Sequence, residues 1–198
     1  MTEPYRTVAG PGEASFTVRG SEFLGYVRPV DTVADAEAVL DRLREEYDDA
    51  THVVPAYRVR ADPLREYASD DGEPTSSAGK PALNVLQGEN LENVVAGVVR
   101  YYGGTNLGVG GLVSAYGRAV SDAVADAGTV TERPHERFVA TVAYDDSGTV
   151  RSILEGADCD FSAEYEATVT FDVRVPVETG PDLRDRLRSA TSGRVEID

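Results

Sequence analysis

Apolar and polar residues alternate near the start of the chain in a way that predicts two strands joined by a tight turn. The segments "ASFTVRG" and "EFLGYVRPV" alternate with a period of two and meet at Gly20-Ser21, a pair suited to a β-hairpin. Asp31 or Thr32 can then cap a helix that runs to about Tyr47. Five apolar residues share one face of that helix: Val33, Ala36, Val39, Leu40 and Leu43.

A nearly continuous apolar segment marks the expected centre of the sheet. The segments "THVVPAYRV" and "REYASD" predict a hairpin around Asp62-Pro63, followed by a short helix over about 77–86. The segment "NVVAGVVRYY", residues 93–102, suits a strand covered on both faces. After a glycine-rich loop, an apolar stripe predicts a helix over about 111–127, which Gly128 ends.

The pattern restarts after Pro134, which marks a domain boundary. From Phe138 the order is strand, helix over about 147–155, two strands, helix over about 179–190 and the strand "RVEI". This β-α-β-β-α-β order is that of a ferredoxin-like split βαβ domain. The sequence therefore predicts an α+β protein with two domains, residues 1–134 and 138–198.

The net charge of the chain limits which partners and which salt conditions we expect for the protein. The net charge is −16, from 35 acidic against 19 basic residues, which argues against nucleic-acid binding over the whole surface and leaves only local basic patches. Acidic residues spread along a chain with a single lysine are typical of adaptation to high salt. We hypothesise a halophilic archaeal source, for which the midpoint of thermal unfolding must rise with molar KCl.

No segment suggests a membrane span, a targeting signal or a cofactor motif. No apolar run approaches the roughly 20 residues that a spanning helix needs, and "MTEPYRTVAG" has no basic start or apolar core. The single cysteine, Cys159, has no partner for an internal disulfide, and no Cys/His spacing indicates zinc. We expect a soluble, cytoplasmic protein without a cofactor or a membrane partner.

The stretch "RYYGGTNLGVGGLVSAYG" joins an apolar strand to a helix through six glycines. Backbone amides at such a helix start, with its positive dipole end, can hold an anion. The dinucleotide fingerprint is absent, because Val113 stands where its third glycine would be. The glycines can equally serve positive φ angles and close packing. The residues concerned are Gly103, Gly104, Gly108, Gly110 and Gly111.

The stretch "SDDGEPTSSAGKP" holds the chain's one lysine, Lys80. It is not a P-loop: six residues separate Gly72 from Gly79 where about four are needed, and Pro81 replaces the magnesium-binding Ser or Thr. The carboxylates of this stretch can hold a hard cation or form a solvated turn, and the turn is the interpretation we favour, with no metal. They belong to Asp70, Asp71 and Glu73.

Histidine is scarce, and no hydrolase constellation can be assembled. His52 lies at the start of a predicted strand with no nucleophile nearby, and His135 follows Pro134. Neither G-x-S-x-G nor H-E-x-x-H occurs. We interpret His52 as a structural or hydrogen-bonding residue in preference to a catalytic one.

Three motifs in order, "ATHVVPAY", "SDDGEPTSSAGKP" and "VRYYGGTNLGVGGLVSAYG", resemble the signature of the IMPACT/YigZ family over about residues 13–130. The last sixty residues resemble more weakly the C-terminal domain of its prokaryotic members. The resemblance implies a first domain of the ribosomal-protein type, also found in elongation factor G, and a second domain similar to that factor's last domain. Eukaryotic members regulate translation, whereas prokaryotic members have no established biochemical function.

The resemblance places the family's motifs on a defined set of residues and shows departures. Its histidine falls on His52, its acidic turn on 70–73, its Ala-Gly-x-Pro on 78–81 and its Arg-aromatic-Gly-Gly element on 100–104. Asn106 stands where the family usually has lysine, and Ser114 where it has arginine. The cations left beside the loop are Lys80, Arg100 and Arg118.

Two hypotheses follow from these residues. The first is a translation-associated binding protein that contacts RNA, the ribosome or a translation factor through the glycine loop and the acidic turn. The second is an enzyme for a small phosphorylated or acidic substrate, with His52 or Asp71 as acid-base group; a protein-protein adaptor is a blander third. We favour binding over catalysis, and the sequence leaves the oligomeric state open. The binding surface would comprise Lys80, Arg100, Gly103, Gly104, Asn106, Gly108, Gly110, Gly111, His52, Asp70, Asp71 and Glu73.

Overall fold

The computed structural model describes residues 3–198, which form two compact units, Tyr5–Glu132 and Arg133–Asp198. The first unit is built on a five-stranded antiparallel sheet in the order β2-β3-β6-β4-β5. The apolar strand β6 lies at its centre, as the sequence predicts, because every residue from Val94 to Arg100 is buried. The strands are β2 Gly12–Val18, β3 Ser21–Pro29, β4 His52–Val59, β5 Arg65–Ala68 and β6 Val94–Tyr101.

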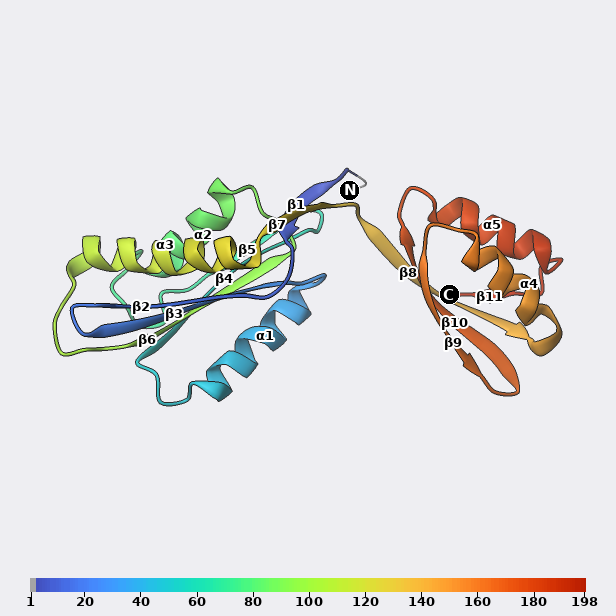
Figure 1. The fold of residues 1–198 in the computed structure, drawn as a ribbon. Helices are drawn as coiled ribbons and strands as arrows, with labels where there is room; N and C mark the ends of the chain where they lie inside the picture. The colour runs from blue at the N-terminus through green and yellow to red at the C-terminus, as the bar shows by residue number, and fades with distance from the viewer. Residues whose placement is uncertain (1–2) are drawn as a thin grey trace. The chain divides into compact units, whose positions relative to one another are not determined.

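Helices cover both faces of this sheet (Figure 1). Helix α1, Val33–Glu46, packs on one face, and α2, Gly79–Gly88, lies with α3, Gly108–Ala127, on the other. The side chain of Thr32 caps α1 by accepting from the Asp35 amide, and Asp35 completes the capping box. The largest core forms between the sheet and the pair α2 and α3.

A separate two-stranded sheet joins the beginning and the end of the first unit. Strand β1, Tyr5–Val8, pairs antiparallel with β7, Thr129–Glu132. The sequence analysis did not predict either strand, because segments of four residues are too short for an alternating pattern to be recognised.

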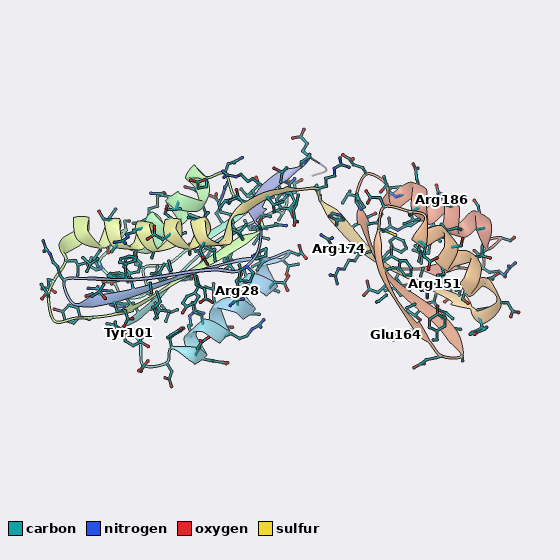
Figure 2. The ribbon with its side chains drawn as sticks, viewed as in Figure 1. Arg28, Tyr101, Arg151, Glu164, Arg174 and Arg186 are labelled. Carbon is teal, nitrogen blue, oxygen red and sulfur yellow. The ribbon has the colours of Figure 1, made fainter. Side chains whose placement is uncertain are left out.

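The second unit has the element order β-α-β-β-α-β and a sheet order β11-β8-β10-β9, with every pair antiparallel. Helices α4 and α5 lie on one face of this sheet and enclose its core (Figure 1). Glu164 and Arg174 project from the face away from the helices (Figure 2). The elements are β8 His135–Ala143, α4 Tyr144–Glu155, β9 Asp160–Tyr165, β10 Thr168–Pro176, α5 Gly180–Ala190 and β11 Glu196–Ile197.

The predicted α+β class with two parts is confirmed, and apart from the unpredicted strands β1 and β7 the differences lie at element ends. The first hairpin turns at Arg19-Gly20, where both residues have positive φ, one residue earlier than predicted. Helix α3 begins at Gly108 instead of Gly111, so that part of the glycine loop is its first turn. Within residues 3–198, no helix is long and apolar enough to span a bilayer.

Candidate functional site

The first carboxylate of the acidic turn, Asp70, holds the turn together. Its Oδ2 accepts from the Ser76 amide at 2.7 Å, and its Oδ1 accepts from the amides of Ala78 and Gly79 at 3.0 and 2.9 Å. Burial disfavours the charged form, but the three amides outweigh it and lower the pKa of Asp70. Asp70 thereby satisfies the start of α2, where the N-cap residue provides no side-chain bond.

The second carboxylate, Asp71, fixes the position of His52. Its backbone has a φ of 48°, and its Oδ2 accepts from the Val53 amide at 2.7 Å. The Asp71 carbonyl lies 2.6 Å from His52 Nδ1. Because a carbonyl can only accept, Nδ1 carries the proton, and the neutral imidazole therefore presents Nε2 as an acceptor.

The third carboxylate, Glu73, forms a buried ion pair at the side of the sheet. Its Oε1 accepts from Arg100 Nη1 at 2.5 Å and from the Tyr116 hydroxyl at 2.7 Å. The side chains of Glu73 and Arg100 are only 4% and 5% exposed. Burial, and then the bond to the Glu73 carboxylate, raise the pKa of Tyr116, so its hydroxyl remains a donor.

The same guanidinium connects the acidic turn to the glycine loop. Arg100 Nη2 donates to Ser21 Oγ at 3.2 Å, and Ser21 Oγ also accepts from the Gly103 amide at 3.1 Å. Gly103 is required here, because a Cβ at this position would lie 1.9 Å from the carbonyl carbon of Gly20. The strand end, the first hairpin and the loop are thus packed through one arginine.

A cleft of about 460 Å³ lies beside this network, within the size range of small-ligand sites. The α3 helix starts at its edge with Leu107 as N-cap, and no side chain caps it. Tyr102 and Val109 are about half exposed, at 47% and 56%. The lining residues are Thr51, His52, Glu73, Pro74, Arg100, Tyr102, Asn106, Leu107, Gly108, Val109 and Leu112.

The structure brings together some of the residues that the sequence singled out. The cleft collects His52, Glu73, Arg100, Asn106 and Gly108. The remaining predicted residues lie around it. Asp70 and Asp71 shape the turn, Gly103 and Gly104 lie in the loop, Gly110 and Gly111 lie in the first turn of α3, and Lys80 is exposed on α2 outside the cleft lining.

Three participants were missed by the sequence analysis: Ser21, Tyr102 and Tyr116. Tyr116 lies on the buried apolar face of α3, yet its hydroxyl reaches Glu73. A tyrosine within an otherwise aliphatic stripe is the available signal, since a buried hydroxyl needs a partner. Ser21 carries no comparable signal in the sequence, whereas Tyr102 lies in the Arg-aromatic-Gly-Gly element at 100–104 but is not among the predicted binding residues.

The acidic turn is committed to protein donors. Asp70 and Asp71 accept from backbone amides, and one oxygen of Glu73 accepts from Arg100 and Tyr116. Among residues 3–198, no group of three or more His, Cys, Asp or Glu side chains is placed to hold a metal ion. The geometry is therefore that of a structural turn that positions His52 and Glu73.

Comparison with known proteins gives matches along the whole chain. The family model of the Impact N-terminal domain matches residues 19–124, and that of a domain of unknown function (DUF1949) matches residues 141–194. The chain is 31% identical to the IMPACT family member YvyE of Bacillus subtilis, over 100% of this chain and 91% of that protein. It is also 31% identical to the IMPACT family member YigZ of Escherichia coli, over 98% and 97%.

Further matches include a yeast homolog and a solved structure. The Protein IMPACT homolog of Saccharomyces cerevisiae is 30% identical over 54% of this chain and 42% of its own length. A crystal structure of a hypothetical protein superposes with a TM-score of 0.72 at 30% identity, covering 100% of this chain and 97% of that one. A solved structure of a similar protein therefore covers both units.

Proposed function

Because the chain belongs to the IMPACT family, we propose that it is a translation-associated regulatory protein that contacts RNA, the ribosome or a translation factor through the cleft at the glycine loop. The resemblance to a family whose eukaryotic members regulate translation supports a role in translation. The cleft supports binding as the activity.

One observation carries the proposal: the uncapped start of the 20-residue helix α3 opens at a cleft that also presents Tyr102 and Arg100. Amides of the first helical turn and the positive end of the helix dipole favour a phosphate group. The half-exposed ring of Tyr102 offers a face on which a base can stack. Phosphate and base are the two features that unpaired nucleic acid presents together.

The cleft is close to electrically neutral, in contrast to the acidic surface. Its charged lining residues are Glu73 and Arg100, and they are paired with each other. Recognition therefore depends on backbone donors and stacking rather than on a cluster of basic side chains. Such contacts tolerate high salt better than exposed phosphate-lysine pairs, which are screened.

A charge variant tests the proposal against a matched control. Val109→Asp places a carboxylate in the first turn of α3, at the cleft, where it repels an anion yet favours the helix dipole. Val113→Asp adds the same charge about one turn further along α3, where the side chain is exposed and outside the cleft lining. Both variants are compared with the unmodified protein for binding to purified ribosomes and tRNA in molar KCl.

We expect Val109→Asp to weaken binding at least about tenfold, the equivalent of 1.4 kcal/mol, and to leave the thermal midpoint unchanged or raised. Val113→Asp should bind like the unmodified protein. Equal binding by all three proteins, or no binding by any of them, would overturn the proposal. Lys80→Ala serves as a second control, because Lys80 lies outside the cleft lining.

The catalytic alternative has one observation in its favour, the pair formed by His52 and Glu73. His52 Nε2 lies 3.8 Å from Glu73 Oε2 at the cleft, and paired titratable groups can act as acid and base. Its test is turnover of small phosphorylated compounds, lost in His52→Asn. Recovery of every compound unchanged after prolonged incubation excludes this alternative.

A further inference from the structure

One side of the cleft presents two hydrogen-bond acceptors to a ligand. Glu73 Oε1 is used by Arg100 and Tyr116, whereas Glu73 Oε2 makes no hydrogen bond within residues 3–198. The Glu73 side chain is only 4% exposed, yet Oε2 is not among the fully buried unpartnered atoms of the described residues, and Glu73 lines the cleft, so a molecule in the cleft can reach this oxygen. His52 Nε2 lies 3.8 Å from that oxygen, and in the neutral imidazole it is an acceptor, because Nδ1–H donates to the Asp71 carbonyl.

The two acceptors do not satisfy each other. A separation of 3.8 Å is too long for a hydrogen bond, and in the neutral imidazole Nε2 has no proton to offer to a carboxylate. Both residues line the cleft, where a ligand can supply donors to each. The arrangement therefore calls for two donors on neighbouring atoms of one molecule.

The pairing of Glu73 with Arg100 favours a ligand whose hydrogen-bond donors carry no charge. Arg100 already neutralises Glu73, so an added ammonium or metal ion would meet a guanidinium held 2.5 Å from the same carboxylate. A hydroxyl pair brings no charge and donates twice. Adjacent hydroxyls on a sugar, a cis-diol, have this chemistry.

The remaining features of the cleft extend the ligand on either side of the diol. The amides at the start of α3 suit a phosphate, and the Tyr102 ring suits a planar base. Phosphate, cis-diol and base together make a ribonucleotide with unmodified 2′- and 3′-hydroxyls. The cleft volume of about 460 Å³ lies in the range for a ligand of small-molecule size.

We propose that the cleft binds a ribonucleotide through its free cis-diol, with Glu73 Oε2 and His52 Nε2 as the two acceptors. This inference rests on the proposed function and specifies its ligand. Two sources carry the same chemistry: a free 5′-ribonucleotide, and the 3′-terminal nucleotide of an RNA. An internal nucleotide of RNA lacks the diol, because its 3′-oxygen is esterified.

The experiment compares probes that differ only at the diol. A fluorescently labelled hexa-adenylate RNA with an intact 3′ end is titrated with the full chain at fixed KCl. The same RNA with a 2′-deoxy or a 3′-phosphate terminus forms the second arm. Adenosine 5′-monophosphate and inorganic phosphate, used as competitors, distinguish the free nucleotide from the RNA end.

We expect the intact end to bind at least about tenfold more tightly than either modified end, since each modification removes one of the two hydrogen bonds that the diol donates to Glu73 and His52. If the mononucleotide displaces the labelled RNA at a lower concentration than the unlabelled RNA does, the ligand is a free nucleotide. Much weaker competition by the mononucleotide would identify the RNA terminus. If phosphate competes as strongly as the mononucleotide does, the proposal that the diol is recognised is wrong.

A variant separates the diol from the rest of the site. In His52→Asn the shorter amide nitrogen can replace the Nδ1–H donor to the Asp71 carbonyl, but no group replaces Nε2. We expect this variant to keep its thermal midpoint within a few degrees and to lose the preference for the intact end. An unchanged preference overturns the diol assignment.

The two proposals fail in different ways. If intact and modified RNA ends bind equally well and Val109→Asp still abolishes binding, the diol proposal is wrong and the proposed function stands. If Val109→Asp binds as well as the unmodified protein, the cleft is not the binding site and both proposals fall.

Discussion

Glu73 and Arg100 illustrate how a residue of the acidic turn can belong to the interior. Removing both charges from water is costly, and the pair is maintained because Tyr116 and Ser21 provide further hydrogen bonds. Arg100 Nε is nevertheless buried without a partner within the described part of the chain. The network is therefore sensitive to the loss of any one member, since each removal leaves a buried charge or donor unmatched.

Glu73→Gln tests this sensitivity. The amide leaves the buried Arg100 without its counter-charge, and we expect the free energy of unfolding to fall by about 3 kcal/mol or more, measured by denaturant unfolding at constant KCl. Glu89→Gln is the control, because the pair of Glu89 with Arg6 is about half exposed and should be worth less than about 1 kcal/mol. Equal effects of the two substitutions would contradict the importance of burial.

Asp70 predicts a specific dependence of stability on pH. Its folded-state pKa is lowered, because the amides of Ser76, Gly79 and Ala78 outweigh the effect of burial. A lowered pKa contributes stability above the unfolded pKa of about 3.9, and this contribution is lost as the pH falls through the folded value. In Asp70→Asn, unfolding midpoints should be lower at pH 6 and fall less between pH 4 and the acid limit. Parallel curves for the two proteins would refute this.

Single residues were predictable from the sequence where their type restricts their role. His52 and Arg100 stand out because charged and imidazole groups are few along apolar strands, and Glu73 stands out as a member of the acidic turn; the family resemblance adds the same positions. The partners of these groups were not predictable. Whether Glu73 meets solvent, a cation or Arg100 depends on contacts between residues 27 positions apart, which no local pattern encodes.

At the scale of elements, the glycines of the loop divide into two kinds. Gly103 packs against the Gly20 backbone, so the hairpin between β2 and β3 is held against the end of β6. Gly110 lies in the first turn of α3 with open space around its Cα. Close packing therefore explains Gly103 but not Gly110, and the anion site at the start of α3 stays a prediction.

Alanine substitutions distinguish these two kinds. Gly103→Ala should destabilise the protein by about 1–3 kcal/mol, because the added Cβ would overlap backbone atoms that cannot move freely. Gly110→Ala should raise stability by about 0.5–1 kcal/mol, since alanine is the better helix former. Thermal and denaturant unfolding measure both, and a stabilising Gly103→Ala would show that the contact is not tight.

Long periodic elements were predicted well, and element ends were not. The helical stripe of α3 and the apolar run of β6 fix those elements from the sequence alone, because burial of one face or of both leaves a clear period. The start of α3 is predicted at Gly111 because glycines favour loops, yet the helix begins at Gly108. Strands β1 and β7 are not predictable from local sequence, because each is extended through its pairing with the other, at the far end of the unit's sequence.

For the whole molecule, the net charge of −16 and the neutral cleft predict how ligand binding depends on salt. Each phosphate neutralised by a free cation contributes about −0.7 to the slope of log K against log salt concentration for a single strand. Because Arg100 is already paired, we expect a slope between about 0 and −1 for RNA, measured by titration over a range of KCl concentrations. A steep slope, below about −3, would place binding on exposed arginines away from the cleft.

The pairing of β1 with β7 gives the first unit a closed outline. The chain enters and leaves at neighbouring positions, with Tyr5 opposite Glu132 in the register. A module of this kind can be spliced into, or appended to, another polypeptide without disturbing its interior. This is consistent with relatives such as the yeast homolog, in which the similarity covers 54% of this chain and under half of the longer protein. Because β1 and β7 close the first unit at one place, the segments joined to this unit can change in evolution while the unit and its cleft keep their structure.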